Sequence, residues 1–462
     1  METSVNFGLL TLLPPLVVII FALKTRKTFE ALIIGAVIAY IIAYGTGFFG
    51  PFLDALQTVV ADDIWMFITL GLFGSFVVLL QKSRGTFGFA NLVEKFSKTR
   101  KKSLMVSWVL GILIFMDDYL NILTVSAAMR DLTDRQKTPR EMLAYVIDST
   151  GAPVCVLIPI STWAVFYAGV VGDQAGMASY GSGMEIYVQA IPFIFYGWTA
   201  IIVVPLVILG IIPNMFGMKK AFERVDTTGR VYSEASDKYN VGRDTLNELI
   251  EEEFQGKVQG NIWNFIIPLV LIVAVTIYTG DLLVGLIIAI LAAMIMYLPQ
   301  KIMTFSEFSE NLATGFASMI PMLFILAGAF VIKASMDEIG LPQYVINGVL
   351  PYMNAQLFPA ITFAVVAALS FVTGSNWGIP ALTVPILIPL ALAGGANPII
   401  AFAAIVSGGT FGSHACFYSD ATVLTSQSCG IENLEHAFTQ IPFAMISAII
   451  ALLLFLISGF VF

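Results

Sequence analysis

Charged side chains are scarce in this sequence, and basic ones disappear altogether after Lys333. Only 12% of the 462 residues are Asp, Glu, Lys or Arg, whereas 58% are hydrophobic and the mean hydropathy is +0.88. Long apolar runs recur along nearly the whole chain, as in polytopic helical membrane proteins, and they argue against the short alternating strands of an outer-membrane barrel. The net charge of −8 does not indicate a nucleic-acid partner.

Cysteine and the usual hydrolase motifs are also lacking. Cys155, Cys416 and Cys429 lie in or beside apolar segments without a Cys-x-x-Cys spacing, so we expect them to be packing residues. No Gly-x-Ser-x-Gly or His-Glu-x-x-His motif occurs, so an intramembrane hydrolase is the least favoured function and we expect no enzyme. The N-terminus has no basic region before its first apolar run, which predicts a first membrane span and not a cleaved signal.

Basic residues cluster in loops and predict which loops are cytoplasmic. Of the 23 Lys and Arg residues, 22 fall in loops assigned to the inside, and Lys333 alone lies at an outer membrane edge. This assignment places the N-terminus outside. Residues 213–260 hold seven basic and nine acidic residues, and we expect a solvated, partly helical cytoplasmic linker there, between transmembrane halves at 1–212 and 261–462.

The two halves resemble each other at a nearly constant offset. Residues 61–76 match 317–332 at an offset of 256, and residues 122–125 and 143–147 match 381–384 and 402–406 at an offset of 259. No Lys or Arg follows Lys333, whereas the matching first-half region has eleven, as expected for an inverted copy. We therefore predict an all-α polytopic membrane protein of two inverted-topology repeats, with re-entrant hairpins, discontinuous helices and about 10–12 membrane segments, which is typical of secondary transporters and not required of a channel.

Two adjacent carboxylates, Asp117 and Asp118, interrupt an apolar segment that has basic residues on both sides. The 27 residues from Ser103 to Met129 are too few for two spans of about 20. The segment therefore predicts a re-entrant hairpin with its tip at Asp117–Asn121, and one broken helix is the alternative. An ionised aspartate at the bilayer centre costs roughly 2.5–3.5 kcal/mol, so intramembrane acids usually line a transport path.

The second half has a matching tip, in which Asn376 takes the place of Asp117. Its sequence is Thr373-Gly-Ser-Asn-Trp-Gly378. Small and hydroxyl residues at a helix break expose oxygen atoms that coordinate small cations, although a Gly-rich helix-packing motif is the alternative. We expect the two tips to meet near the membrane midplane.

A second pair of polar segments is again related by 259. Asp148-Ser-Thr-Gly151 and Ser407 to His414 are both expected to interrupt apolar helices. His414 is either a proton carrier, because imidazole titrates near neutral pH, or a buried hydrogen-bonding residue, and Asp420 is either a weaker ion-binding candidate or a boundary cap. Four aromatic residues could line a pocket for an organic solute or simply pack: Trp163, Tyr167, Trp377 and Phe417.

Four motifs, in order, resemble the NhaC family of sodium/proton antiporters. They are Phe115-Met-Asp-Asp-Tyr-Leu-Asn121, Asp148-Ser-Thr-Gly-Ala-Pro153, Thr373-Gly-Ser-Asn-Trp-Gly378 and Ser419-Asp-Ala-Thr422. The resemblance implies an ion-transporter-superfamily fold, commonly a homodimer, in the cytoplasmic membrane, with Na⁺ and H⁺ as coupling ions and no other cofactor. The sodium ligands would then be Asp117, Asn121, Thr373, Ser375 and Asn376, and the further cation- or proton-binding candidates Asp118, Asp148, Ser149, His414 and Asp420.

One motif departs from the family pattern, which often reads Thr-Gly-Thr-Ser-Trp-Gly where this chain has Ser375 and Asn376. An amide at Asn376 could bind a carboxylate or an ammonium group. Coupled transport or exchange of a small organic solute, such as an amino acid, malate or lactate, is therefore the alternative function.

Adjacent carboxylates suggest how one site could exchange two ions. Desolvation and like charge both disfavour joint ionisation of Asp117 and Asp118, so one of them is expected to bind either a proton or a sodium ion near neutral pH. Successive helical side chains point about 100° apart, so only one carboxylate can face the cavity. The repeat pairs Asp117 with Asn376, so we predict that Asp117 binds the ion and that Asp118 is structural.

Overall fold

The computed structural model describes residues 7–25, 27–62, 64–83, 85, 98–115, 117–159, 161–172, 174, 176–240, 261–279, 281–374 and 377–462. All the regular elements within these ranges are helical. The chain is an all-α membrane protein, as the sequence predicts.

The first half contains the helices up to the linker: α1 (Leu13–Thr25), α2 (Thr28–Tyr44), α3 (Phe49–Asp62), α4 (Ile64–Lys82), α6 (Arg100–Leu113), α7 (Asp118–Arg135), α8 (Arg140–Asp148), α9 (Ala152–Cys155), α10 (Thr162–Gly172), α11 (Gly183–Ala190) and α12 (Phe195–Leu209). The linker contains α13 (Phe216–Thr228) and the 3₁₀ helix η5 (Glu234–Tyr239). The second half contains α15 (Trp263–Thr279), α16 (Leu282–Tyr297), α17 (Phe305–Ser318), α18 (Ile320–Glu338), α19 (Leu341–Val349), α20 (Phe358–Thr373), α21 (Gly378–Ala393), α22 (Pro398–Ala415), α23 (Asp420–Cys429) and α24 (Asn433–Val461).

The repeat is visible in the helices themselves. α3 and α4 recur as α17 and α18, each beginning and ending 256 residues later. Contacts between the halves recur with the partners exchanged. The contact of α7 with α23 corresponds to that of α21 with α10, and the contact of α8 with α24 corresponds to that of α22 with α12. This twofold pattern is the one expected of a duplicated transporter.

A pair of serines repeats the same local geometry in the two halves. Ser161 Oγ donates to Cys155 O at 2.6 Å and accepts from Ala164 N at 3.1 Å. Ser419 Oγ donates to Ser413 O at 2.6 Å and accepts the backbone N–H three residues on, at 3.2 Å. The start of α10 and the start of α23 are therefore equivalent.

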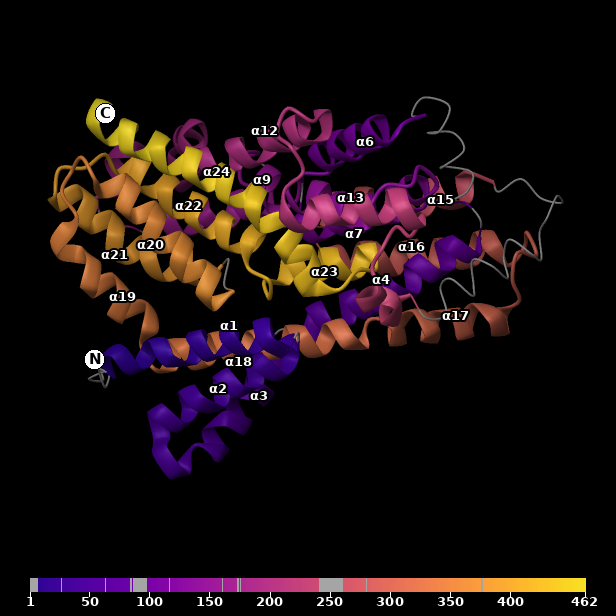
Figure 1. Ribbon diagram of the computed structural model, residues 1–462, viewed down its shortest axis with the longest axis horizontal. Coiled ribbons are helices and arrows are strands. Elements are labelled where there is room, and N and C mark those ends of the chain that lie inside the picture. The colour runs from indigo at the N-terminus through magenta and orange to yellow at the C-terminus, as the bar shows by residue number, and fades with distance from the viewer. Residues whose placement is uncertain are drawn as a thin grey trace.

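Both halves contribute to both layers of the molecule. In Figure 1, α1, α2, α3 and α18 lie in one layer, where α2 packs on α18 and α4 packs on α17. The other layer holds α20, α22 and α24 together with α9 and α12. The described candidate site residues lie on or next to helices α20 and α22 of this second layer and on or next to α7, α8, α10, α21 and α23.

Several described helices are long and apolar enough to span a membrane. Three do so singly, at Phe29–Gly47, Pro398–Cys429 and Asn433–Val461. Two bent pairs qualify together, Phe49–Asp62 with Phe67–Leu80 at 54° and Gly183–Phe193 with Phe195–Leu209 at 46°. Shorter apolar helices of 10–17 residues, such as Phe358–Thr373 and Gly378–Ala393, fall short of the roughly 20 residues that a full span needs.

The two predicted hairpins have a helix on each side of a break. α6 ends at Leu113 and packs on α7, which begins at Asp118. α20 packs on α21 after Gly374, whose φ of +65° ends α20 in the left-handed region. The first break lies slightly earlier than predicted, so Asn121 stands in the first turn of α7 and not at the tip.

The polar segment from Ser407 to His414 does not break its helix, so that expectation is wrong. α22 runs without interruption from Pro398 to Ala415. The glycines in this segment allow α20 to approach instead: a Cβ on Gly408 would lie 2.7 Å from Val366 Cβ, and one on Gly412 would lie 2.2 Å from Ser370 Cβ. This is the small-residue packing that membrane helices use for close contact.

Replacing Gly412 with Ala should destabilise the protein, because the new methyl group would also lie 2.7 Å from the backbone carbonyl carbon of Ser370. Overpacking of this kind typically costs about 1–3 kcal/mol. Gly169→Ala in α10 is the matched control, since a Cβ there meets nothing within 4 Å. Thermal unfolding in detergent should show a lower transition for Gly412→Ala only, and equal transitions would refute the packing role.

The linker is not simply a solvated connector, which corrects the expectation for its described part. Met218, Ala221 and Val225 of α13 are buried, and so are the polar Ser236 and Asn240. Asn240 Oδ1 accepts from two buried guanidinium groups, of Arg130 at 3.2 Å and of Arg140 at 2.7 Å. The described linker residues therefore pack against α7, α8 and α24, and residues 241–260 lie outside the described ranges.

Candidate ion-binding site

The break between α6 and α7 separates the two adjacent carboxylates. Asp117 is the N-cap of α7, because its Oδ1 accepts from Leu120 N at 3.1 Å. Its Oδ2 accepts from the Thr162 hydroxyl at 3.2 Å, which ties the cap to α10. The Asp117 side chain is partly exposed and is engaged through both oxygens.

Asp118, the first residue of α7, has the opposite surroundings. Its side chain is 0% exposed, and neither carboxylate oxygen has a hydrogen-bond partner among the described residues. Asp118 also interacts electrostatically with Asp117 and with Asp420 of α23. A carboxylate without partners in a membrane interior is costly, so it requires a proton or a cation to neutralise it.

Asn121 adds an oxygen to the same face of α7. It lies three residues after Asp118, within one helical turn. Its Nδ2 donates to Gly111 O, Ile114 O and Thr150 O at 2.5, 2.9 and 2.9 Å, so the amide orientation is set by three carbonyl acceptors. Its Oδ1 is buried and has no partner among the described residues.

The two other carboxylates near Asp118, those of Asp117 and Asp420, already have hydrogen-bond partners. Among the described residues, no three His, Cys, Asp or Glu side chains are placed to hold a metal ion. Tyr119 donates to Asp420 Oδ2 at 2.5 Å, and Ala421 N donates to Oδ1 at 2.8 Å, so Asp420 is already paired. A cation at Asp118 would therefore complete its shell with amide, hydroxyl or carbonyl oxygens, which hard cations prefer.

The tip of the second hairpin lies close to this site through its aromatic residue. Trp377 packs on Trp163 at 4.6 Å and on Phe166 at 4.8 Å between ring centroids. The Trp163 indole lies beside the Asp118 carboxylate without meeting hydrogen-bond geometry. Thr373 is buried and donates to Leu369 O at 2.8 Å. Two predicted ligands at this tip, Ser375 and Asn376, lie outside the described residues.

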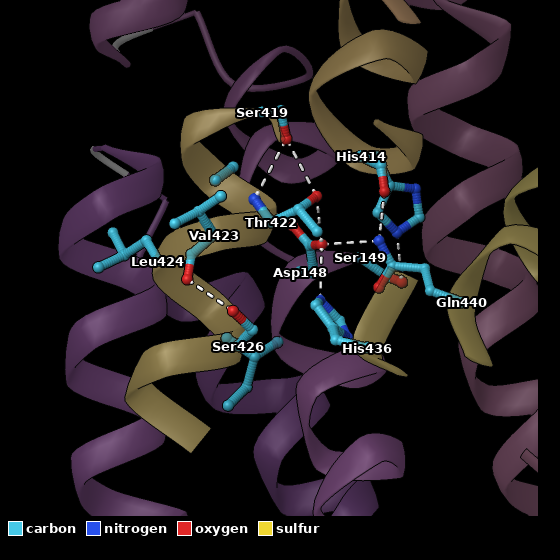
Figure 2. Close-up of polar contacts among 12 residues, drawn as sticks. Asp148, Ser149, His414, Ser419, Thr422, Val423, Leu424, Ser426, His436 and Gln440 are labelled. Atoms are coloured by element: carbon cyan, nitrogen blue, oxygen red, sulfur yellow. Dashed lines mark hydrogen bonds and ion pairs between the residues drawn. The ribbon is translucent and has the colours of Figure 1, made fainter. Parts of the chain in front are cut away.

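A second buried polar centre surrounds Asp148, at the end of α8. Its Oδ2 accepts from Thr422 Oγ1 at 3.2 Å, from His436 Nε2 at 3.1 Å and from Gln440 Nε2 at 2.6 Å, as Figure 2 shows. These partners come from α23 and α24. Asp148, a residue of the first half, therefore contacts α23 and α24 of the second half at the break after α8.

His414 is held on both sides of its ring. Its Nε2 contacts Ser149 Oγ at 2.8 Å, and its Nδ1 contacts the Tyr196 hydroxyl at 2.7 Å. The side chain is 1% exposed. Of the two roles predicted for His414, the contacts favour a buried hydrogen-bonding residue that joins α22 to α8 and α12.

The four aromatic pocket candidates do not lie together. Trp163, Tyr167 and Trp377 pack in one apolar core, and Trp163 and Tyr167 are both 0% exposed. Phe417 belongs to the other core and packs on Tyr418 at 4.8 Å. Trp163 Nε1 and the Tyr167 hydroxyl have no hydrogen-bond partner among the described residues, so two buried donors are available in this cluster.

Sequence reasoning missed His436, Gln440, Tyr119 and Tyr196. A usable signal existed for the first two, because His436 and Gln440 are polar residues four apart in the long apolar helix α24 and so share one face. Tyr119 and Tyr196 carry no such signal, since tyrosine is common at apolar positions.

Two comparisons show which known proteins this chain resembles. The family model described as the Na⁺/H⁺ antiporter family matches residues 154–460, which begin six residues after Asp148 and include the second half as far as residue 460. A protein of Haemophilus influenzae, named as uncharacterized, is 26% identical over 496 aligned residues that cover 98% of this chain and 91% of the relative. The resemblance to NhaC-type transporters is thereby confirmed, and the chain belongs to the Na⁺/H⁺ antiporter family.

Proposed function

We propose that this chain is a secondary active transporter of the cytoplasmic membrane that exchanges Na⁺ for H⁺ at one carboxylate near the midplane. The family is one of transporters and implies Na⁺ and H⁺ as the transported ions. The observation that supports the finer proposal is the buried Asp118 carboxylate, which has no hydrogen-bond partner in the described part of the chain. Asn121 Oδ1, one turn along α7, likewise has none there.

The two adjacent aspartates would then have roles opposite to those predicted from the repeat. Asp118 binds the ion, because no described residue hydrogen-bonds its oxygens, and Asp117 positions α7 as its cap. The second hairpin would supply further ligands from Thr373, Ser375 and Asn376. Trp377 beside Trp163 supports this, because it holds that tip near Asp118.

Competition at a single carboxylate couples the two ions. An ionised Asp118 without a cation is costly in a low-dielectric interior, whereas the sodium-bound and the protonated forms are both neutral. The two halves, 1–212 and 261–462, would move against each other only when the site is loaded. Each sodium ion that leaves on one side is then replaced by a proton from the other side, and no cofactor is needed.

Purified protein in liposomes that contain a trapped pH dye provides the test. We expect addition of Na⁺ outside to change the internal pH, and we expect K⁺ at the same concentration to have a smaller effect. The absence of any alkali-cation-dependent pH change in folded, inserted protein would refute the proposal. The oligomeric state in detergent would test the proposed homodimer.

A second candidate function is coupled transport of a small organic solute. It is supported by the Trp163 indole and the Tyr167 hydroxyl, because two buried donors to which the described residues offer no acceptor suit a carboxylate group. In the same liposomes, uptake of a labelled amino acid or organic acid without a sodium-dependent pH change would select this function.

A further inference from the structure

The polar centre at Asp148 contains a buried histidine that exchange at Asp118 does not use. His436 is 0% exposed and Asp148 is 1% exposed, and His436 Nε2 lies 3.1 Å from Asp148 Oδ2. The two residues come from different halves of the chain, since Asp148 ends α8 and His436 lies in the first turns of α24. Figure 2 shows Asp148 between His436 and the start of α23.

The atoms in this centre that lack partners are acceptors. Among the described residues, His436 Nδ1 and Gln440 Oε1 have no hydrogen-bond partner, although both are buried. The Gln440 amide cannot be turned around, because its Nε2 donates to Asp148 Oδ2 and to the carbonyl oxygen of His414. With Nε2–H on the carboxylate, neutral His436 presents a bare lone pair at Nδ1. A second proton, on Nδ1, gives an imidazolium that still donates from Nε2 to the Asp148 carboxylate.

Other titratable groups on the helices around His436 do not take the place of Asp148. They include Arg140, Glu141 and Tyr145 of α8, Tyr196 of α12, Arg224 of α13, His414 of α22, Asp420 and Cys429 of α23, and Glu432 and Glu435 of α24 itself. Among the described residues, Asp148 is the carboxylate that bonds the ring directly. His414, by contrast, contacts two hydroxyl groups and no carboxylate.

We infer that His436 is a second proton-binding site of the exchanger, separate from the carboxylate that binds sodium. A proton taken from water adds to Nδ1, and the charge of the resulting imidazolium is balanced by the Asp148 carboxylate. The inference rests on the proposed function, and it makes the stoichiometry two protons per sodium ion, one at Asp118 and one at His436.

The number of protons per sodium ion tests this in liposomes with the membrane potential held at zero. Against a fixed sodium gradient, the pH gradient that stops net flux should be twice as large for His436→Gln as for the wild type. Ser447→Ala is the control, because it removes another buried polar group of α24 that bonds Phe443 O, and its balance point should equal that of the wild type. An unchanged balance point for His436→Gln would overturn the inference, as would loss of sodium-for-sodium exchange in a folded variant.

Histidine protonation can also be observed without transport. The chain contains only two histidines, so the ¹⁵N spectrum of histidine-labelled protein has two imidazoles, and a His414→Gln sample assigns them. The His436 signals should titrate in sodium-free buffer and should still do so in Asp118→Asn. A His436 ring that stays neutral down to the pH at which the protein unfolds would overturn the inference. Failure of the proposed function would appear differently, as a wild type with no sodium-dependent proton flux.

Discussion

Asp118→Asn should abolish sodium-driven proton movement, lowering its rate more than about 100-fold, or about 2.8 kcal/mol at 1.4 kcal/mol per factor of ten. The change keeps the shape of the side chain and removes its charge. Since Asp118 is completely buried and has no hydrogen-bond partner among the described residues, its charge is the group available to hold a sodium ion there. The rate of Na⁺-dependent pH change in liposomes measures the effect.

Asp117→Asn is the matched control and should reduce the rate only a few-fold. Asparagine and aspartate are almost equally good N-caps, so the Oδ1 contact to Leu120 N that begins α7 is preserved. Both variants should keep the solubility and elution profile of the wild type. If Asp117→Asn were inactive and Asp118→Asn active, the order predicted from the repeat would hold and the assignment from geometry would be refuted.

The sequence predicted the features that depend on composition and on long-range repetition. The all-α membrane class, the repeat near an offset of 256–259 and the break at Asp148 follow from apolar runs, charge distribution and local polar residues. The first hairpin could also be predicted, because a segment of 27 residues between basic flanks is too short to cross a membrane twice. These signals need no knowledge of side-chain contacts.

The roles of the two aspartates could not be predicted, because they depend on the first residue of one helix. α7 begins at Asp118, which turns Asp117 into its cap and leaves Asp118 facing inward. A shift of one residue would exchange these positions, and a sequence pattern does not locate a helix end that closely. The same reasoning applies to Ser407–His414, where glycines serve the packing of α20 on α22 and do not break the helix.

Contacts between distant parts of the chain also could not be predicted from the sequence. His436 meets Asp148 across 288 residues, and only the folded arrangement of α8 and α24 brings them together. The linker is a second case. Its mixed charge suggests a solvated segment, yet part of that charge is paired with buried groups of the transmembrane helices.

The strongest of these linker contacts joins α13 to α8. Both terminal nitrogens of Arg224 donate to the Glu141 carboxylate, at 2.8 and 2.9 Å. The Glu141 side chain is 0% exposed, and Arg224 is 20% exposed. Arg224 Nη1 also lies 3.7 Å from Glu435 of α24, in the turn that carries His436. This cluster therefore links the linker to both helices that form the Asp148–His436 pair.

Arg224→Met should destabilise the protein by about 3–5 kcal/mol, because it leaves the buried Glu141 carboxylate without its cation. Removing the carboxylate as well, in Arg224→Met with Glu141→Met, should restore most of the stability, since apolar side chains of similar volume often replace a buried ion pair without loss. Lys219→Met is the control on the same helix: its partner Glu223 lies 3.9 Å away and both side chains are mostly exposed, so the loss should stay below about 1 kcal/mol. Unfolding transitions in detergent should therefore be lowest for the single Arg224 variant. A double variant as unstable as the single one would show that Arg224 stabilises the linker through its other contacts, to Arg230 O and Val231 O, and not through Glu141.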